Sequence, residues 1–582
     1  MSMDDTTIQQ AIKKIVLRNA MEYGGSARYD VVISKVVGLR PDLRPTIKEQ
    51  IPLIRKIVDE VNSLDHAEQE RMASELMVFE NVTKNAKRKE ELNLPPLQGA
   101  SMGKVVTRFP PEPNGYPHIG HAKAAIIDQE YARMYNGKLI LRFDDTNPLN
   151  EQLEFYDAIR EGLEWLGVKP DLVKNTSDDI DLLQSYGRKM VMNGDAYVCT
   201  CRPEDIHSMR ARSVNCPCRG LDSTSSDRVT RLNKFFDGSF EQNGAIIRFR
   251  GDMSDLNTAM RDPTLFRIID ADHPKLGTRI RAFPTYDFAA PIEDSLDGVT
   301  HAMRTKEYEL RNPLYFSVLK SLGLRMPSLL EFSRLEFEGM PVSKRKLKPL
   351  IQGGLVSGWD DPRLPTLTAL RKRGILPEAI YKFVLSLGIS LADSKPPFES
   401  LESYNRKLLD RISLRLFFVK HPVEIRIVDS TSRKIELKNH PTAQLGTRNV
   451  QTSDRIYIDK ADADRLNDGH EIRLMEMHNI RLDDETIREK ATEYLRVINT
   501  GQEIKSNIPK VQWVSYDDMV PFTVIVPGKL FINEEFNKDS LYTYNGIAES
   551  YVSKVPTSSN IQFVRFGFCR LQTNGVAIYT HD

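Results

Sequence analysis

Two stretches near the N-terminus carry an apolar residue at every third or fourth position, as amphipathic helices do. These residues are Ile8, Ala11, Ile12, Ile15 and Val16, followed by Ile51, Ile54, Ile57, Val58 and Val61. A helical appendage is therefore predicted for residues 1–97. The lysine-rich run 84–89 and the pair Pro95-Pro96 are typical of a linker at its end.

Residues 98–198 follow a different pattern, in which short apolar runs alternate with helical spacing. Strands are predicted at 104–109 and 139–143, and helices at 121–135 and around 156–166. Such a β-α-β order is typical of half of a doubly wound sheet that binds a nucleotide. We expect the second half of that sheet at 279–350.

Between these halves, residues 199–278 break the alternation with four cysteines and are predicted to form an inserted domain. Residues 351–415 return to helical spacing. After residue 420 apolar and polar residues alternate strictly, which predicts strands and two β-barrels for residues 416–582. The alternating apolar residues include Val423, Ile425, Ile427, Phe522, Val524, Val526, Val564, Phe566 and Phe568. The predicted fold class is thus multidomain α/β with a helical appendage and a β-rich end.

Composition changes this picture little. The 582 residues are enough for about three to five domains, with 40% hydrophobic and 28% charged residues. A net charge of +1 gives no overall nucleic-acid signal, so RNA contacts are expected from local basic runs such as 344–348 and 371–373. No leader-like N-terminus and no apolar run of about 18 residues is present, so we expect no membrane contact and a cytoplasmic protein.

The most informative stretch is Thr-Arg-Phe-Pro-Pro-Glu-Pro-Asn-Gly-Tyr-Pro-His-Ile-Gly-His, residues 107–121. It reads as a strand, a proline-stiffened loop and a helix N-terminus, the arrangement that binds phosphates in α/β folds. His118 and His121 offer donors for phosphoryl oxygens, while Gly120 lets a flat ligand approach the backbone. Two histidines at a helix start can also be simple caps, but the surrounding loop argues against that interpretation.

Residues 108–123 closely resemble the HIGH signature of class I aminoacyl-tRNA synthetases, in the form of the glutamyl/glutaminyl branch. Residues 332–335 and 341–347 resemble the mobile KMSKS loop of the same enzymes, with Pro341 in place of the first lysine, as is usual in the glutaminyl-like branch. A lone Ser-Lys-Arg-Lys run would more often be a solvated loop, but its position behind an α/β pattern favours the signature. The resemblance extends from about residue 100 to the end.

The β-rich end resembles glutamyl-tRNA synthetases of the archaeal/eukaryotic type, because bacterial glutamyl enzymes carry a helical anticodon domain there. By this resemblance, segment 199–278 would contact the tRNA acceptor stem, 351–415 would be a helical stem-contact domain and 416–582 would bind the anticodon. The fold would be a Rossmann-type catalytic domain with that insertion.

The resemblance implies that ATP, with Mg²⁺, activates L-glutamate as an adenylate, which a ribose hydroxyl of tRNA(Glu) then attacks. Negative charge grows on the α-phosphate, so preorganised donors and cations matter most. We assign this catalytic role to His118, His121 and Lys344, and assign no general base. The predicted ATP-binding residues are Glu112, Pro113, Asn114, His118, Ile119, Gly120, His121, Ala122, Lys123, Ala124, Thr305, Arg334, Leu335, Val342, Ser343 and Lys344.

Four residues are predicted to bind the amino acid. Asp144 resembles the acidic residue that holds the substrate ammonium, and Tyr286 the tyrosine at its side chain; their alternatives are a turn residue and a core tyrosine. Arg304 stands where glutamate enzymes carry arginine and glutamine enzymes a small uncharged residue, and Arg108 offers a second guanidinium. A guanidinium pairs with a carboxylate but is under-compensated by an amide.

Ala290 supports the same choice, because glutaminyl enzymes carry a histidine at that position. The alternatives are a glutaminyl-tRNA synthetase, a small nucleotidyltransferase with a HIGH-type loop and an inactive RNA-binding paralogue. Arg304 and Ala290 argue against the first, the chain length against the second. The third would need damage at His118, His121 or Lys344, and none is present.

Cys199, Cys201, Cys216 and Cys218 lie within one short segment of the insertion. We predict a structural Zn²⁺ site of four thiolates, with four free thiols as the alternative, since the C-x-C spacing is tighter than the usual knuckle. Cys569, on a predicted strand, is expected to be a small core residue.

Archaeal-type relatives suggest two further expectations. Many of them also place glutamate on tRNA(Gln), a product that a tRNA-dependent amidotransferase then corrects. The N-terminal appendage resembles the tail module of such amidotransferases, although a helical bundle that only stabilises the fold is an equal alternative.

Overall fold

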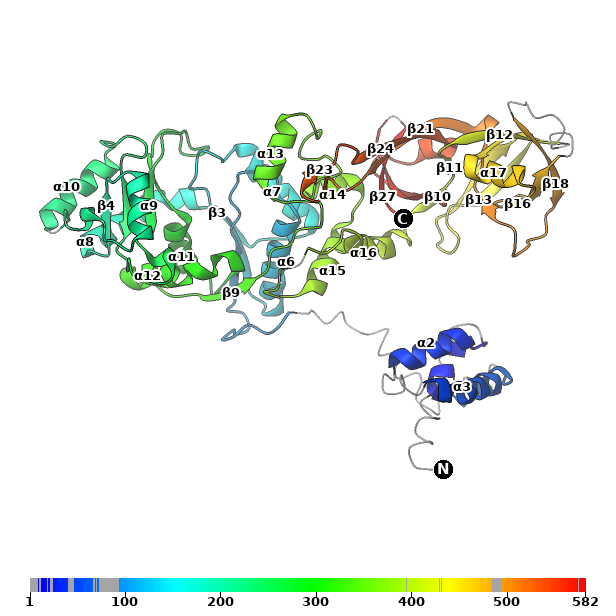
Figure 1. Cartoon of the computed structure of the whole chain (residues 1–582), viewed down its shortest axis with the longest axis horizontal. Helices are drawn as coiled ribbons and strands as arrows, with labels where there is room; N and C mark the ends of the chain where they lie inside the picture. Colours follow the sequence, from blue (N-terminus) through cyan, green and yellow to red (C-terminus); the bar gives the residue numbers. More distant parts are fainter. Residues whose placement is uncertain are drawn as a thin grey trace. The chain divides into compact units, whose positions relative to one another are not determined.

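The computed structural model describes residues 9, 12–17, 19–20, 25–39, 47–65, 68–69, 71–72, 94–222, 224–393, 395–428, 430, 432–483, 494–573 and 575–582. The chain divides into two compact units, residues 1–92 and 93–582, and each has its own apolar core (Figure 1). Leu94 and Leu97, near the predicted end of the appendage at residue 97, pack into the core of the second unit.

The first unit is helical. Residues 12–17 form part of one helix, followed by α2 (Tyr29–Leu39) and α3 (Ile47–Asn62). Most of the apolar residues that predicted these helices are buried together: Ile12, Ile15, Val16, Ile54, Ile57, Val58 and Val61. Ile8, Ala11 and the run 84–89 lie outside the described residues.

A parallel sheet begins the second unit. Strands β1 (Val106–Phe109), β2 (Lys138–Phe143) and β3 (Leu172–Asn175) are hydrogen-bonded in the order β1-β2-β3, with α6 (Ile119–Met134) and α7 (Leu153–Leu166) as the crossovers. Strands β8 (His301–Thr305) and β9 (Ser328–Phe332) form a second parallel pair. They continue the sheet on its other side, because the Thr300 amide donates to the Val106 carbonyl at 2.9 Å.

An antiparallel sheet separates these two parallel parts, and its strands follow the order β4-β5-β6-β7. The strands are β4 (Ala196–Cys199), β5 (Ile246–Phe249), β6 (Thr264–Ile268) and β7 (Ala282–Pro284). The helices of this region are α8 (Ile180–Asn193), α9 (Pro203–Ala211), α10 (Ser225–Phe236), α11 (Tyr286–Leu296) and α12 (Asn312–Leu322). The sheet extends past both ends of the predicted insertion 199–278, since β4 begins at Ala196 and β7 ends at Pro284. α8 and α12 share its apolar core.

Four helices follow: α13 (Lys344–Gln352), α14 (Leu367–Arg373), α15 (Pro377–Leu387) and α16 (Glu399–Leu409). α15 packs on α6 and α7, while α14 and α16 contact the last strand of the chain. Arg373 makes this second contact: its guanidinium donates to the Thr580 carbonyl at 3.0 Å and to Glu402 at 2.9 Å. It is therefore buried, and the basic run 371–373 offers fewer free cations than its sequence indicates.

Two barrel-like sheets of seven strands complete the unit. The first has the order β10-β25-β26-β27-β21-β24-β11 and the second β19-β16-β17-β18-β12-β15-β20. The strands of the first are Leu414–Leu416, Asn560–Phe563, Gly567–Leu571, Val576–His581, Met519–Pro527, Leu541–Glu549 and Phe418–Val419. Those of the second are Lys510–Val511, Ile472–Leu474, Asn479–Leu482, Leu495–Gly501, Pro422–Ile427, Arg455–Asp459 and Val514–Ser515. The prediction of strands after residue 416 is confirmed, and Cys569 is buried on β26 as expected.

Three smaller elements belong to this region. The hairpin β13 (Arg433–Lys438) and β14 (Thr447–Thr452) and the helix α17 (Lys460–Asn467) accompany the second sheet. The hairpin β22 (Phe531–Ile532) and β23 (Glu535–Phe536) reaches α13, where Leu530 packs with Leu347 and Leu350. Among the described residues, no helix is long and apolar enough to cross a membrane.

Candidate active site

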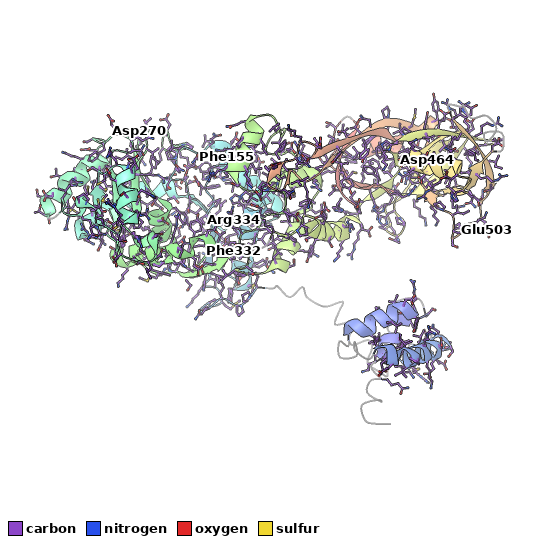
Figure 2. All side chains as sticks on the ribbon, viewed as in Figure 1. Phe155, Asp270, Phe332, Arg334, Asp464 and Glu503 are labelled. Atoms are coloured by element: carbon purple, nitrogen blue, oxygen red, sulfur yellow. The ribbon has the colours of Figure 1, made fainter. Side chains whose placement is uncertain are left out.

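A cavity of about 470 Å³ opens where the parallel strands end and α6 begins. Its wall includes Phe109 at the end of β1, Asp144 directly after β2, Thr305 at the end of β8 and Phe332 at the end of β9. Figure 2 labels Phe332 and, close to it, Arg334 from the loop that follows β9. The carboxyl ends of parallel strands beside a helix N-terminus are where α/β sheets bind ligands.

The loop before α6 is shaped by its own side chains. His118 is the N-cap: its Nδ1 accepts a hydrogen bond from the Gly120 amide at 3.1 Å, while its own amide donates to His121 Nδ1 at 3.2 Å. Because this capping begins the helix at Ile119, α6 starts two residues before the predicted His121. The rings of the two histidines lie 3.8 Å apart.

This hydrogen bonding fixes what the histidines can donate. Burial lowers the pKa of His118 well below its ordinary value and that of His121 to about 3, and Lys344 and Arg334 act in the same direction. Both rings are therefore neutral at pH 7. Since each Nδ1 accepts a backbone amide, the single proton of each ring is on Nε2. Two neutral N–H donors are thus available, neither of which serves as an acid or a base.

Lys344 brings a cation to the same loop from the start of α13. Its side chain lies against Gly115, so closely that a Cβ added at that glycine would be 2.8 Å from Lys344 Cε. Burial lowers the pKa of Lys344 to about 8, although Glu112 nearby acts in the opposite direction. The lysine is therefore mostly charged at pH 7 and loses its charge as the pH rises through about 8.

The loop is also held from the helical segment. The Ile119 amide donates to the Pro365 carbonyl at 3.0 Å, and the Leu367 amide donates to the Pro117 carbonyl at 2.8 Å. Tyr116 stacks on Trp359 with ring centroids 5.8 Å apart. Because these contacts fix the backbone of residues 116–119, the histidine donors are preorganised rather than mobile.

Most of the predicted ATP-binding residues line the cavity: Glu112, Asn114, His118, Gly120, His121, Ala124, Thr305, Arg334, Leu335, Val342 and Lys344. Five others do not, namely Pro113, Ile119, Ala122, Lys123 and Ser343. Ile119 and Ala122 are fully buried in the core behind α6. Their side chains therefore face the core and not the cavity, because consecutive positions of a helix point in different directions.

Lys123, another of the predicted ATP-binding residues, contacts the segment after β9. Its Nζ donates to the Ser333 carbonyl at 2.6 Å and to Ser333 Oγ at 3.2 Å. Only 3% of the residue is exposed, and burial lowers its pKa to about 8. It therefore ties α6 to the backbone beside Arg334 instead of reaching the cavity.

At the other end of the cavity, Asp144 presents a free carboxylate oxygen. Its Oδ1 accepts from Arg142 Nε at 2.8 Å and from Thr176 Oγ1 at 3.1 Å. Its Oδ2 is buried and has no hydrogen-bond partner among the described residues. A cationic ligand group would supply the missing donor.

Arg304 is the complementary cation on the opposite strand β8. It is 4% exposed and lies over three aromatic rings, with its Cζ 5.9 Å from the Tyr286 centroid, 5.0 Å from Tyr308 and 5.4 Å from Tyr315. Its Nε and Nη1 have no hydrogen-bond partner, and it forms no ion pair with any residue that the structure describes. A buried guanidinium in this state calls for an anionic ligand.

Arg108, the fourth residue predicted to bind the amino-acid substrate, lies beneath the cavity and not in its wall. It is fully buried and pairs with Asp294, whose Oδ1 lies 3.0 Å from Arg108 Nε, while Arg108 Nη1 donates to the Met303 carbonyl at 2.7 Å. Its Nη2 has no partner among the described residues. Ala290 is buried and does not line the cavity, whereas the neighbouring Ala289 does.

Several lining residues were missed from the sequence. Asp128 lies on the same face of α6 as His121 and Ala124, so helical spacing gave a signal for it. Burial raises its pKa well above the ordinary value, and its Oδ1 has no partner among the described residues. Arg267 comes from β6 of the inserted region and Tyr308 from a turn after β8, and no local signal marked either.

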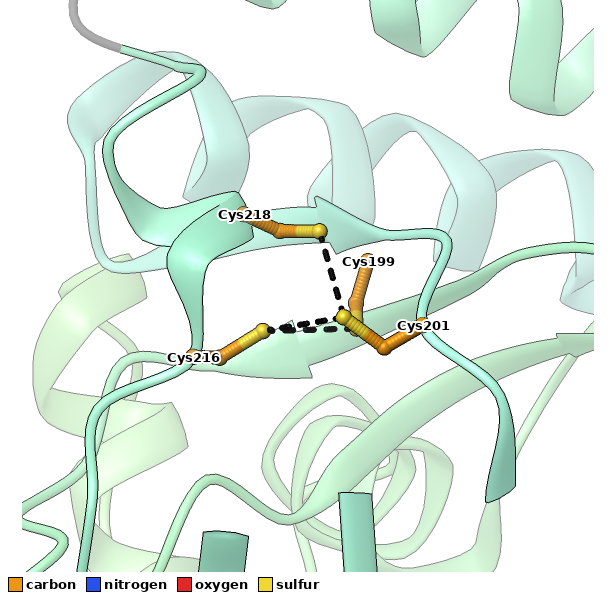
Figure 3. A group of neighbouring side chains, drawn as sticks. All are labelled: Cys199, Cys201, Cys216 and Cys218. Atoms are coloured by element: carbon orange, nitrogen blue, oxygen red, sulfur yellow. Dashed lines mark hydrogen bonds between the residues drawn. The ribbon is translucent and has the colours of Figure 1, made fainter. Parts of the chain in front are cut away.

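The four clustered cysteines form a second site, at the edge of the inserted sheet (Figure 3). Their sulfur atoms all lie within 4.8 Å of one another, with Cys199–Cys216 at 3.6 Å, Cys201–Cys216 at 3.7 Å and Cys201–Cys218 at 3.7 Å. Four thiolates at about 2.3 Å from one tetrahedral Zn²⁺ would be about 3.8 Å apart. The donor set and its spacing therefore fit zinc.

Comparison with known proteins extends these observations over the whole chain. Family models match residues 104–411 as "tRNA synthetases class I (E and Q), catalytic domain", and residues 413–498 and 510–572 as "tRNA synthetases class I (E and Q), anti-codon binding domain". The chain is 47% identical to a glutamate–tRNA ligase of Cenarchaeum symbiosum (strain A), covering 98% of each. It is 46% identical to that of Nitrosopumilus maritimus (strain SCM1), covering 99% of this chain and 100% of the other.

A solved structure, a glutamate tRNA ligase from Elizabethkingia meningosepticum in complex with its amino acid, is 22% identical. The match covers 53% of this chain and 70% of the chain in that structure, with a TM-score of 0.41.

Proposed function

Since the chain belongs to the class I glutamate–tRNA ligases, we propose that its 470 Å³ cavity joins ATP and L-glutamate into glutamyl-adenylate and that the glutamyl group then passes to tRNA(Glu). The proposal assigns the α6 end of the cavity to the nucleotide and the Asp144–Arg304 end to the amino acid. Mg²⁺ enters with the phosphates of ATP as part of the substrate.

The observation that carries this proposal is the unpaired guanidinium of Arg304. Free glutamate has one ammonium group and two carboxylates, of which the α-carboxylate reacts with ATP. The ammonium group matches the free Oδ2 of Asp144, and the side-chain carboxylate matches Arg304. Glutamine would leave Arg304 buried without a counter-charge, so the charge balance of the pocket favours glutamate.

At the nucleotide end, the reaction needs donors where charge develops. When the α-carboxylate of glutamate attacks the α-phosphorus, pyrophosphate leaves and the equatorial oxygens gain negative charge. The Nε2–H groups of His118 and His121 supply two fixed donors at the loop, and Lys344 supplies a cation beside Gly115 for the leaving phosphates. The histidines stay neutral and act only as donors. The attacking carboxylate is already ionised at neutral pH, so the step needs no base.

Three predicted ATP-binding residues support this assignment indirectly. Lys123 anchors the backbone next to Arg334, and Ser343 is the residue before α13, where it precedes Lys344. Pro113 accepts the Gln152 amide at 3.2 Å and so connects the loop to the segment after β2. These residues shape the nucleotide site without forming its wall.

The cysteine cluster would hold one Zn²⁺ through Cys199, Cys201, Cys216 and Cys218. A site of four protein ligands leaves no open position for a substrate, so the ion would stabilise the inserted region instead of taking part in the reaction.

We further infer that the enzyme charges tRNA(Gln) with glutamate as well. The anticodon-binding region matches a model that covers glutamate and glutamine enzymes together, while the pocket carries the charge of a glutamate enzyme. Such a product requires a tRNA-dependent amidotransferase as a partner. Charging of both purified tRNA transcripts with labelled glutamate tests this, and charging of tRNA(Glu) alone, with a tRNA(Gln) transcript that another enzyme accepts, would refute it.

The main proposal is tested by ATP–pyrophosphate exchange with glutamate or glutamine, each with and without tRNA. We expect exchange with glutamate and little with glutamine. Exchange that prefers glutamine would revive the glutaminyl alternative, and no exchange with either amino acid, with or without tRNA, would favour an inactive paralogue.

A further inference from the structure

Asp294 lies beneath the amino-acid end of the cavity and uses both carboxylate oxygens. Oδ1 accepts from Arg108 Nε at 3.0 Å and from Arg142 Nη1 at 2.9 Å, and Oδ2 accepts from the Tyr315 hydroxyl at 2.9 Å. The residue is fully buried on α11 and does not line the cavity. Sequence reasoning did not single it out.

Each partner of Asp294 leads to a group at the cavity. Arg142 Nε donates to Asp144 Oδ1 at 2.8 Å. The Tyr315 ring lies under the Arg304 guanidinium, and Arg108 Nη1 holds the carbonyl of Met303, the residue before Arg304. One carboxylate is thus connected to the groups proposed for the substrate ammonium and for its side-chain carboxylate.

Groups of this network also keep unused hydrogen-bonding capacity. Nη2 of Arg108, Nη2 of Arg142 and Oδ2 of Asp144 are buried and have no partner among the residues that the structure describes. Buried polar atoms usually have hydrogen-bond partners. Here their orientation is fixed by the network, so that a ligand or its water molecules can bind to them.

Electrostatics explains why a carboxylate is needed at this point. Arg108 and Arg142 are like charges and would repel each other without an anion between them. Burial opposes ionisation of Asp294, but the two guanidinium groups outweigh it and lower its pKa. Asp294 is therefore an anion at neutral pH and holds both cations in place.

We propose that Asp294 is the positioning residue of the amino-acid site: it acts on Asp144 through Arg142, and on Arg304 through Tyr315 and through the contact of Arg108 with Met303. It thereby sets the distance between the groups that bind the ammonium and the side-chain carboxylate of the amino acid. This inference rests on the proposed function, because it concerns the same pocket. It adds a residue that acts through others and touches no substrate atom.

The test compares Asp294→Asn with Asp297→Asn in ATP–pyrophosphate exchange. Asp297 is a matched control, because it accepts from the same Arg142 Nη1 at 3.1 Å and from Lys174 at 2.8 Å, but contacts neither Arg108 nor Tyr315. We expect Asp294→Asn to raise the KM for glutamate about tenfold or more, with the KM for ATP unchanged within about twofold. Asp297→Asn should change the KM for glutamate much less.

The sign of the effect separates positioning from bulk charge. Removing an anion makes the pocket more positive, which by itself would lower the KM for the anionic glutamate. A lowered KM, equal changes for glutamate and ATP, or equal effects of the two variants would each overturn the proposal. Thermal unfolding of each variant is measured alongside.

If Asp294→Asn does not fold, Tyr315→Phe decides, since it removes one donor to Asp294 and keeps the ring under Arg304. A rise of about two- to fivefold in the KM for glutamate alone supports the proposal, and no change overturns it. If the wild-type protein activates glutamine instead, the proposed function fails, and the same comparison is made on the KM for glutamine, because Asp294 also positions Asp144 through Arg142.

Discussion

Replacing Arg304 by glutamine separates substrate recognition from folding more sharply than any other change in the cavity. This guanidinium is 4% exposed, and its Nε and Nη1 have no hydrogen-bond partner among the described residues. It lies over aromatic rings, and its Nη2 donates to the Tyr308 carbonyl at 3.5 Å. Removing it therefore breaks no ion pair among the described residues. The charge that is lost becomes important only when an anionic ligand arrives.

The magnitude follows from the interaction that glutamate would lose. A hydrogen bond to a charged group contributes about 1.5–3 kcal/mol, and an arginine–carboxylate pair is commonly bidentate. At about 1.4 kcal/mol for each factor of ten, a loss of about 3 kcal/mol lowers kcat/KM for glutamate by roughly 100-fold. The thermal stability of the variant should stay equal or rise, because a buried unpaired cation is removed.

The assay is exchange kinetics with glutamate and glutamine, together with a thermal unfolding curve. Arg304→Lys is the matched control: it keeps the charge but not the planar donor pair, so its loss should be smaller than that of Arg304→Gln. The ratio of glutamate to glutamine activation should fall in Arg304→Gln. Unchanged glutamate kinetics, or a large drop in stability, would show that Arg304 is a structural residue.

Other predictions concern the nucleotide end and the metal site. His121→Ala and Lys344→Ala should each slow exchange about 100-fold or more while leaving tRNA binding by filter assay nearly intact, since both groups act on charge that develops in the transition state; unchanged turnover in either would contradict the assignment. Exchange should also fall as pH rises through about 8, because Lys344, with its pKa of about 8, is charged below that value and neutral above it; Lys344→Arg should keep activity at pH 9 relative to pH 7. The four cysteines should bind one Zn²⁺ per chain in elemental analysis of protein purified without a metal-binding tag, and a value near zero with all four thiols titrating would leave free thiols.

Local patterns in the sequence carried much of the fold. Helical spacing identified α3 through Ile54, Ile57, Val58 and Val61, and strict alternation identified the strands after residue 416. What the sequence could not show was which segments share a core. The inserted sheet begins at Ala196 and ends at Pro284, and it shares one core with α8 and α12, which depends on contacts between distant segments.

The site divides in the same way. Groups on the motif loop, such as His118, His121 and Gly120, line the cavity where their spacing placed them. A motif read as consecutive letters also included Ile119 and Ala122, which helix geometry turns into the core. Arg108 was recognised as a guanidinium for the substrate, but its burial on Asp294 depends on a contact with α11, far along the chain. Tertiary contacts of that kind leave no local trace.

The two ends of the cavity use opposite electrostatic arrangements. Around α6, the histidines are buried and neutral, so they add donors without adding charge next to Lys344 and Arg334. Around Asp294, cations and carboxylates alternate from Asp144 through Arg142 to Arg108, and fixed charge is balanced within the protein. Arg304 stands outside that balance, with no counter-charge among the described residues. A purely structural role does not explain a buried arginine without a counter-charge, since an ionic partner would lower the free energy of the folded state. The unpaired charge of Arg304 is best explained by a ligand: the side-chain carboxylate of glutamate supplies the missing counter-charge.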